Sequence, residues 1–346
     1  MPIINNGGYE YPTEEGPNVT LASVREYDPG QITRKAGDAV VVGAGMAGLL
    51  TARVLADSFE QVTIVEKDTL PDAPVVRKGI PQGNHIHNLH EAGRRTLEDL
   101  FPGFSEEVRA AGGTRIDLNS DFRVYIEDGY QTHGPSQIPM YCASRPLFEL
   151  ITRRRVTEIH NITLRENCQF IEYLVGQTSP NVEGVTVRNE GREEEVTADL
   201  VVDATGRTSR TPNWLADQGY PTPPVDEVHI DIAYSTAIVN RPEGAKKTRL
   251  TLPNPPRKRG GGLFPVENER WLMTLFGVHG DHPPTNPGEF QQFAASFPVN
   301  DFQQVINDHG LGTDAIQHYP FPSNKRIRYE ELDHFPKGLL VIGDGI

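Results

Sequence analysis

The chain has 346 residues, of which 37% are hydrophobic and 23% are charged, so its composition is that of a globular protein and excludes wholesale disorder. The formal net charge of −14 argues against a nucleic-acid partner, because phosphate binding requires a basic surface. Two cysteines are too few for a disulfide scaffold or a four-cysteine metal site. No apolar stretch is long enough to span a membrane and no signal peptide is evident, so we expect a cytoplasmic protein.

The predicted elements begin after a polar extension over residues 1–36, which we expect to be flexible. Residues 38–42 form an apolar, β-branched run typical of a buried parallel strand. A glycine turn follows at residues 43–48, and helix formers occupy residues 49–58. A second apolar strand over residues 61–65 completes a βαβ unit, whose strands must be parallel.

Later segments mix helices and strands in chain order. A loop is expected over residues 80–89, with helices over 91–100, 145–159 and 289–297. Strands are predicted over 121–131, 163–175, 184–188, 195–203 and 339–342, and a hairpin over 262–278. Residues 211–258 are rich in proline and predicted to be irregular. In the helix at 289–297 three phenylalanines recur at helical spacing, which favours core packing over a substrate-binding role.

The glycine turn fits the pattern G-x-G-x-x-G. Gly43 permits the tight turn, Gly45 lets a pyrophosphate approach the backbone, and Gly48 lets the helix pack closely on the strand. The N-terminus of the following helix offers unpaired N–H groups and a partial positive charge to the phosphates. Met46 and Ala47, within the glycine turn, are therefore candidate cofactor-binding residues. The second strand ends at the acidic Glu66, which is suited to ribose hydroxyls and disfavours a 2′-phosphate. The flanking strands and helix favour a dinucleotide site over a glycine turn that binds nothing.

Four segments carry a resemblance to a known family. They are the glycine turn with Glu66 and Lys67, the stretch from Arg77 to His87, Ser144-Arg145-Pro146 at a helix start, and the strand and turn over residues 199–207. Together they resemble the FAD-dependent monooxygenases with the para-hydroxybenzoate hydroxylase fold, and within these the squalene-epoxidase-like branch that includes bacterial polyether epoxidases. The resemblance covers residues 37–346.

The resemblance implies further cofactor-binding residues. Arg77 and Arg145 would approach FAD, and Asp203 and Gly206 would lie near its adenine end. The terminal Gly343 and Asp344 are similar to the start of the family's Gly-Asp motif, whose carboxylate holds the ribityl chain. Because family members continue through a further helical region, the resemblance also implies that this chain is truncated at its C-terminus.

The fold class implied is α/β, with a Rossmann-like FAD-binding domain built on a parallel sheet and a mostly antiparallel substrate-binding sheet. Residues 37–118, 140–212 and 325–346 would form the FAD-binding domain, and residues 119–139 and 213–324 the substrate-binding domain.

The function implied is a monooxygenase that inserts one oxygen atom from O2 into a small apolar substrate, by epoxidation or hydroxylation through a flavin hydroperoxide. NADPH or NADH would reduce FAD transiently, since no second dinucleotide fingerprint is present. A flavin-dependent reductase of isoprenoid double bonds, similar to geranylgeranyl reductase, shares these motifs and remains an alternative. A non-catalytic, truncated FAD-binding protein is another. Contact with a membrane surface is compatible with an apolar substrate.

Two further groups of residues are candidates for the site. His85 and His87 are the candidate catalytic residues because the resemblance places their loop beside flavin and substrate; a metal site with His90 is the disfavoured alternative, so no metal is expected. The predicted hairpin carries aromatic and proline side chains suited to an apolar pocket, although a core role fits each aromatic residue equally well. These pocket candidates are Phe264, Pro265, Trp271 and Phe276.

Overall fold

The computed structural model describes residues 27–32, 35–134, 138–176, 181–312 and 315–346. One layer is a five-stranded parallel sheet in the order β18-β12-β1-β2-β8. Its strands are β1 (Ala36–Val42), β2 (Phe59–Val65), β8 (Ile162–Arg165), β12 (Leu200–Asp203) and β18 (Leu339–Val341). The crossover between β1 and β2 is α1 (Met46–Ser58), so the predicted βαβ unit is confirmed.

Both faces of this sheet are covered, which explains the uninterrupted apolar run in β1. One face packs on helices, with Val41 and Ile64 in the same core cluster as helical side chains. These helices are α1, α2 (Glu91–Leu100), α3 (Phe104–Ala110) and α4 (Arg145–Thr157). On the other face, Val40 and Val201 pack with Val185 of a three-stranded antiparallel sheet. That sheet contains β9 (Cys168–Val175), β10 (Val182–Asn189) and β11 (Arg192–Thr197).

A second large sheet has seven mostly antiparallel strands in the order β17-β13-β16-β15-β14-β5-β6. They are β5 (Phe122–Ile126), β6 (Gly129–Tyr130), β13 (Val225–Asn240), β14 (Thr248–Thr251), β15 (Arg259–Val266), β16 (Arg270–Gly277) and β17 (Gln317–Ile327). Helices α6 (Pro287–Ala295) and α7 (Asp301–His309) pack on one face of this sheet. Phe290 of α6 and Met273 of β16 are fully buried there, which confirms the core role of the phenylalanine stripe. The parallel sheet and the separate, mostly antiparallel sheet confirm the predicted α/β fold class.

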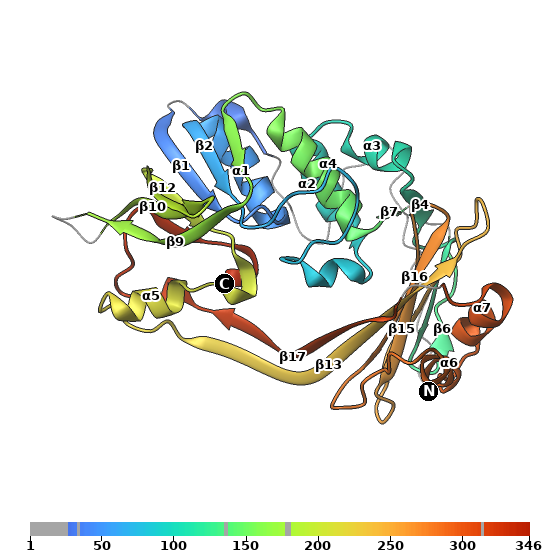
Figure 1. Cartoon of the computed structure of the whole chain (residues 1–346). Helices are drawn as coiled ribbons and strands as arrows, with labels where there is room; N and C mark the ends of the chain where they lie inside the picture. The colour runs from blue at the N-terminus through green and yellow to red at the C-terminus, as the bar shows by residue number, and fades with distance from the viewer. Residues whose placement is uncertain (1–26, 33–34, 135–137, 177–180, 313–314) are drawn as a thin grey trace, which may run out of the picture.

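The prediction that residues 211–258 are irregular was wrong. This stretch contains α5 (Thr211–Asp217), β14 and the 16-residue strand β13. With β17, β13 forms a long ribbon that runs from the seven-stranded sheet towards the parallel sheet (Figure 1). Ala233 pairs with Gly277 on one side and with Pro320 on the other, so distant segments, and no local signal, define the strand.

The remaining differences are local. The strand expected over residues 121–131 is a hairpin, because Glu127 and Asp128 take positive φ angles of 49° and 64° and turn the chain. A small sheet of β3 (Asn88–Leu89), β7 (Pro139–Cys142) and β4 (Thr114–Asp117) was not predicted, nor were α3, α7 and β17. Most of the N-terminal extension lies outside the described residues. Tyr27, within its described part, packs on the core between the parallel sheet and its helices, and its hydroxyl donates a hydrogen bond to Asp57 at 2.6 Å.

Candidate functional site

The glycine turn between β1 and α1 has the geometry that its sequence predicts. Gly43 has φ +106°, and a Cβ there would lie 2.7 Å from the carbonyl oxygen of Ala204. A Cβ at Gly48 would lie 1.9 Å from the Gly43 oxygen, so helix and turn touch at this point. At Gly45 a Cβ would make an ordinary van der Waals contact with Ile80 Cδ1 at 3.7 Å and would clash with nothing, so the missing side chain leaves room at the turn. Each glycine therefore has a different structural role.

The acidic end of β2 is tied to this turn. Glu66 is 5% exposed, and its Oε2 accepts a hydrogen bond from the Ala44 amide at 2.8 Å. Its Oε1 accepts from the Asp68 amide at 3.0 Å. Because a carboxylate oxygen can accept two hydrogen bonds, Oε1 retains capacity for a hydroxyl of a ligand.

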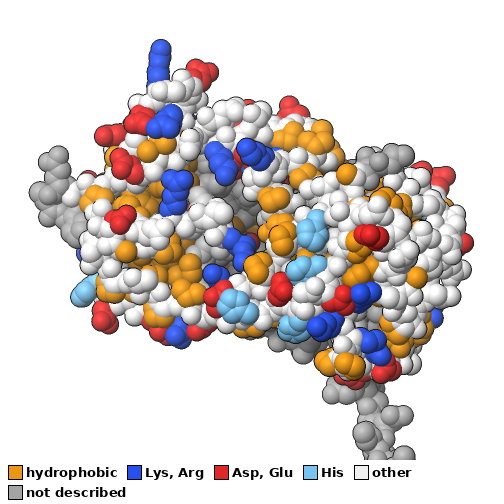
Figure 2. All heavy atoms as spheres, turned by 60° about the horizontal axis from the view of Figure 1, so that its bottom comes forward, with side chains coloured by type: hydrophobic (Ala, Val, Ile, Leu, Met, Phe, Trp, Pro, Cys, Tyr) orange, Lys and Arg blue, Asp and Glu red, His pale blue; other side chains and the backbone are white. Residues whose placement is uncertain are grey.

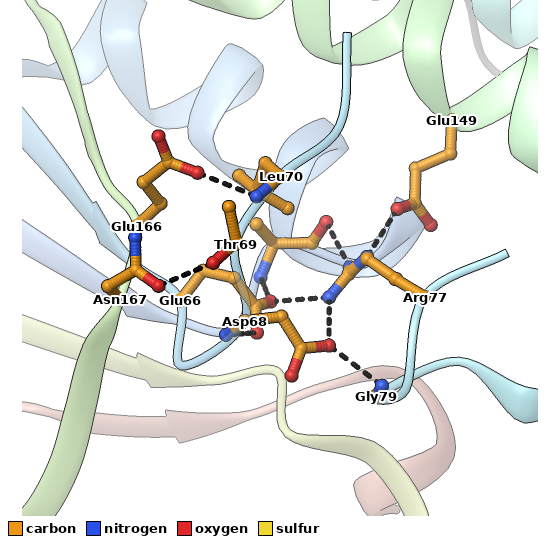
Figure 3. Close-up of polar contacts among 10 residues, drawn as sticks. Glu66, Asp68, Thr69, Leu70, Arg77, Gly79, Glu149, Glu166 and Asn167 are labelled. Atoms are coloured by element: carbon orange, nitrogen blue, oxygen red, sulfur yellow. Dashed lines mark hydrogen bonds and ion pairs between the residues drawn. The ribbon is translucent and has the colours of Figure 1, made fainter. Parts of the chain in front are cut away.

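Arg77 lies at the centre of a buried cluster of charges, in which Glu66, Asp68 and Glu149 all point towards its guanidinium (Figure 3). Arg77 contacts them at 3.0, 3.2 and 2.7 Å and donates to the Ala44 carbonyl at 2.9 Å. Burial acts to lower the pKa of Arg77, but the charges of Glu149 and Glu66 outweigh it and raise the pKa overall. Arg77 thus joins the loop after β2 to α4 and the glycine turn.

Arg145 is the first residue of α4 and differs from Arg77 in lacking a full set of partners. Its Nε is buried and has no hydrogen-bond partner in the described residues. Burial lowers the pKa of Arg145, although Glu149 and Asp344 oppose the shift. The preceding residue, Ser144, caps the helix by accepting from the Leu147 amide at 3.2 Å. A half-buried arginine with a buried, unsatisfied Nε donor is suited to an anionic ligand.

The turn after β12 is organised by Asp203, which is 2% exposed. Its Oδ1 accepts from the amide and hydroxyl of Thr205, and its Oδ2 from the hydroxyls of Ser209 and Thr211. Tyr173 donates a further bond at 3.3 Å, and burial raises the pKa of its hydroxyl. Asp203 borders the cleft, but its carboxylate is already engaged, so its contribution is to hold the turn that ends at Gly206.

These segments enclose a cleft of about 830 Å³. Figure 2 shows Lys and Arg side chains around a hollowed part of one face. Of the predicted cofactor residues, all but Gly48 line the cleft: Gly43, Gly45, Met46, Ala47, Glu66, Lys67, Arg77, Arg145, Asp203, Gly206, Gly343 and Asp344. Sequence reasoning did not single out Gln82 within the segment from Arg77 to His87, and it missed Arg210 and the start of β9, where Gln169 and Phe170 also line the cleft. No local motif marks Arg210 or the start of β9, because the fold brings them to the cleft.

The cleft fits FAD. The space at Gly45, the uncapped first turn of α1 and the unsatisfied Nε of Arg145 are all suited to an anionic group such as a pyrophosphate. Glu66 retains acceptor capacity for a ribose hydroxyl.

A second, apolar cavity of about 460 Å³ meets the first at His87, which lines both. His85 and the predicted pocket residues Phe264 and Phe276 line this second cavity. Trp271 and Pro265 are not among its lining residues. Residues alternate between the two faces of a strand, and Trp271 belongs to the core beneath α6 and α7, where it is 1% exposed.

The histidines are held by different partners. His85 is 7% exposed, and its Nδ1 lies 2.7 Å from Thr236 Oγ1. Burial, followed by the charges of His87 and His318, lowers the pKa of His85 to about 4. Burial also lowers the pKa of His87, whose Nδ1 lies 3.0 Å from the His85 carbonyl. Both imidazoles are therefore neutral at pH 7.

Within the described residues, no group of three or more His, Cys, Asp and Glu side chains is arranged to hold a metal ion. No helix in the described ranges has both the length and the apolar character needed to cross a membrane.

Comparison with known proteins places the chain in a family. No family model matches it. Protein Rv3254 of Mycobacterium tuberculosis is 33% identical over 338 residues, which cover 92% of this chain and 69% of that protein. The chain belongs to the family of Protein Rv3254.

Solved structures share the fold at low sequence identity. PqsL, a probable FAD-dependent monooxygenase from Pseudomonas aeruginosa, has a TM-score of 0.64 at 17% identity, covering 90% of this chain and 79% of its own. The flavin-dependent brominase Bmp2 has 0.63 at 17% identity, with 90% and 72% covered. The tetrameric form of 2-methyl-3-hydroxypyridine-5-carboxylic acid oxygenase has 0.60 at 18%, with 90% and 76% covered. The expected flavin-monooxygenase fold is confirmed by these likenesses.

Proposed function

We propose that this protein is an FAD-dependent monooxygenase that transfers one oxygen atom from O2 to a small apolar substrate, by epoxidation or hydroxylation, with NADPH or NADH as reductant. One observation carries the proposal: a cleft with a dinucleotide-type turn and an apolar aromatic cavity share His87 in their walls. A cofactor in the first and a substrate in the second would both lie against this side chain. The shared fold with flavin-dependent oxygenases supports the same conclusion.

The cofactor-binding roles follow from the geometry of the cleft. The amides of Met46 and Ala47 at the start of α1 would bind the pyrophosphate, which the room at Gly45 admits. Oε1 of Glu66 would accept from a ribose hydroxyl. Arg145 would use its unpartnered Nε on an anionic or carbonyl oxygen of the cofactor. Asp344 lines the cleft beside Gly343, where its carboxylate would accept from the ribityl hydroxyls.

When bound, FAD would supply the redox chemistry and the activation of O2. The residues of this chain would bind, orient and exclude water. The aromatic walls of the second cavity would keep the reacting centre dry, which protects reactive species from water. His87 would stand at the junction as a neutral imidazole whose Nδ1 donates to the His85 carbonyl, so its Nε2 could accept one hydrogen bond.

The same reasoning supports a division into two functional regions. We propose that residues 37–118, 140–212 and 325–346 build the FAD-binding domain and that residues 119–139 and 213–324 build the substrate-binding domain. The parallel sheet lies in the first set, and the strands that border the apolar cavity come mainly from the second.

The first test is the visible absorption spectrum of the purified protein, followed by chromatography of the cofactor released on denaturation. We expect a flavin spectrum and released FAD. Gly45→Val should fold but lose FAD, since its side chain would fill the space for the pyrophosphate without touching the backbone. Gly129→Val is the matched control, because Gly129 has open surroundings in β6 and lies outside the cleft. Equal FAD content in the two variants would refute the assigned site.

Turnover separates the proposed activity from its rivals. NAD(P)H oxidation with oxygen uptake coupled to an oxygenated product would support the monooxygenase. A saturated product formed without oxygen would instead assign a reductase of double bonds. Bound FAD with no turnover of any apolar substrate would indicate a non-catalytic FAD-binding protein.

A further inference from the structure

The apolar cavity is bordered by a hydrogen-bonded histidine, His85, whose polarity its aromatic walls do not require. Among the described residues that line it there is no Lys, Arg, Asp or Glu. The lining comes from residues 85–90, from β7 and from strands of the seven-stranded sheet. It comprises His85, Ile86, His87, Asn88, His90, Phe122, Met140, Tyr234, Leu250, Gly262, Phe264, Thr274, Phe276, Tyr319 and Phe321. A charged ligand would therefore meet no counter-charge in this wall.

His85 begins a chain of buried hydrogen bonds. Its Nδ1 lies 2.7 Å from Thr236 Oγ1, which lies 2.6 Å from Thr274 Oγ1. Thr236 and Thr274 face each other across β13 and β16 and are 3% and 5% exposed. The rings of Tyr234 and Tyr319 flank the imidazole, with centroids 6.2 and 5.7 Å away. The aromatic rings and the sheet thus hold His85 in one orientation.

The chain of hydroxyls couples the tautomer of His85 to the direction of its hydrogen bonds. If Thr236 donates to Nδ1, the proton of the neutral imidazole is on Nε2, which then donates. If Nδ1 carries the proton, it donates a hydrogen bond to Thr236, Thr236 donates to Thr274, and Nε2 becomes an acceptor. Within the described part of the chain Nδ1 is the ring nitrogen with a hydrogen-bond partner, so Nε2 is left for a ligand. Either direction leaves every member of the chain paired.

We propose that His85 selects flat, uncharged substrates that carry one hydroxyl or carbonyl group, and that the Thr236–Thr274 pair adjusts its tautomer to match that group. A hydroxyl or a carbonyl can bind Nε2, whereas a carboxylate of the same shape would be desolvated without a compensating charge. This inference rests on the proposed function in treating the cavity as the substrate site. It goes beyond it by naming the polar group that the substrate carries.

The test is equilibrium binding of three probes of similar shape to the purified full-length chain at pH 7, by calorimetry. The probes are 2-naphthol, naphthalene and 2-naphthoate. We expect 2-naphthol to bind about tenfold more tightly than naphthalene, as one net hydrogen bond allows, and 2-naphthoate to bind at least about tenfold more weakly than 2-naphthol.

Substitution of the Thr236–Thr274 pair, called the relay below, tests its role. Thr236→Val removes one hydroxyl at nearly constant shape, and Thr274→Val breaks the far end of the chain. Each should reduce the preference for 2-naphthol over naphthalene to about threefold or less. Thr236→Val, at a residue outside the cavity lining, should leave naphthalene binding unchanged. Thr251→Val is the matched control, because Thr251 is 1% exposed in β14 of the same sheet and lies outside the cavity lining.

Three results would overturn the inference: equal binding of 2-naphthol and 2-naphthoate, no binding of any probe, or an unchanged preference in both relay variants. Failure of the proposed function is distinguishable, because these measurements use neither turnover nor flavin. A chain that lacks FAD but prefers 2-naphthol would refute the oxygenase and retain the His85 inference. A chain that contains FAD but shows no such preference would refute the His85 inference and retain the oxygenase.

Discussion

Replacing Arg77 with methionine tests the buried charge cluster that holds the cofactor cleft together. Methionine keeps much of the volume and the unbranched stem but removes the guanidinium. The change leaves Glu66 and Glu149, each 5% exposed, without the cation that they contact at 3.0 and 2.7 Å. It also removes the donor to the carbonyl oxygen of Ala44. The glycine turn, the loop after β2 and α4 all lose a shared partner.

The expected cost follows from these contacts. Removing one partner of a buried ion pair destabilises a protein by about 3–5 kcal/mol, because a buried charge is left uncompensated. Arg153 partly compensates Glu149, since its charge interacts with that carboxylate. We therefore expect Arg77→Met to lower the free energy of unfolding by about 3 kcal/mol at pH 8. Adding Glu149→Gln should recover roughly 1–2 kcal/mol, as coupled neighbours do in double-mutant cycles.

The assay is urea unfolding followed by the fluorescence of the two tryptophans, Trp214 and Trp271. A penalty below about 1 kcal/mol at pH 8 would refute the reasoning.

Three further changes test separate contacts. Gly48→Ala should lower both the urea midpoint and the FAD content, because the added Cβ would lie 1.9 Å from the carbonyl oxygen of Gly43. Normal values of both would contradict the observed packing. Glu267→Gln should lower the free energy of unfolding in urea by about 1–3 kcal/mol, because the Glu267 carboxylate accepts from both the amide and the hydroxyl of Ser144 and a glutamine amide has one acceptor oxygen. Ser144→Ala should then cost less in the Glu267→Gln background than it does alone. The pKa of His85 lies near 4 when folded and near 6.5 when unfolded, so its contribution to stability is complete above pH 6.5 and is lost as the pH falls towards 4. His85→Gln should remove this component, roughly 1–3 kcal/mol, from the urea stability curve, and an identical pH dependence in both proteins would rule it out.

The features that could be predicted from the sequence are those encoded within one short segment. The βαβ unit depends on an apolar run, three glycines and one helix, all within residues 36–65, so local patterns suffice. The cap at Ser144 and the hairpin of β15 and β16 are local in the same sense. The cofactor residues named from these motifs line one cleft because the carboxyl ends of parallel strands meet at one edge of a sheet.

Other features depend on pairing between distant segments, and the sequence alone could not determine them. β13 is a strand because β16 and β17 hydrogen-bond to it, although prolines flank it and its pattern is broken near Asp231. Whether Trp271 or Phe276 lined the pocket was undecided until the register of β16 assigned each to a face. The partnership of His85 with Thr236 joins residues 151 positions apart, and only tertiary packing can bring them within a hydrogen bond.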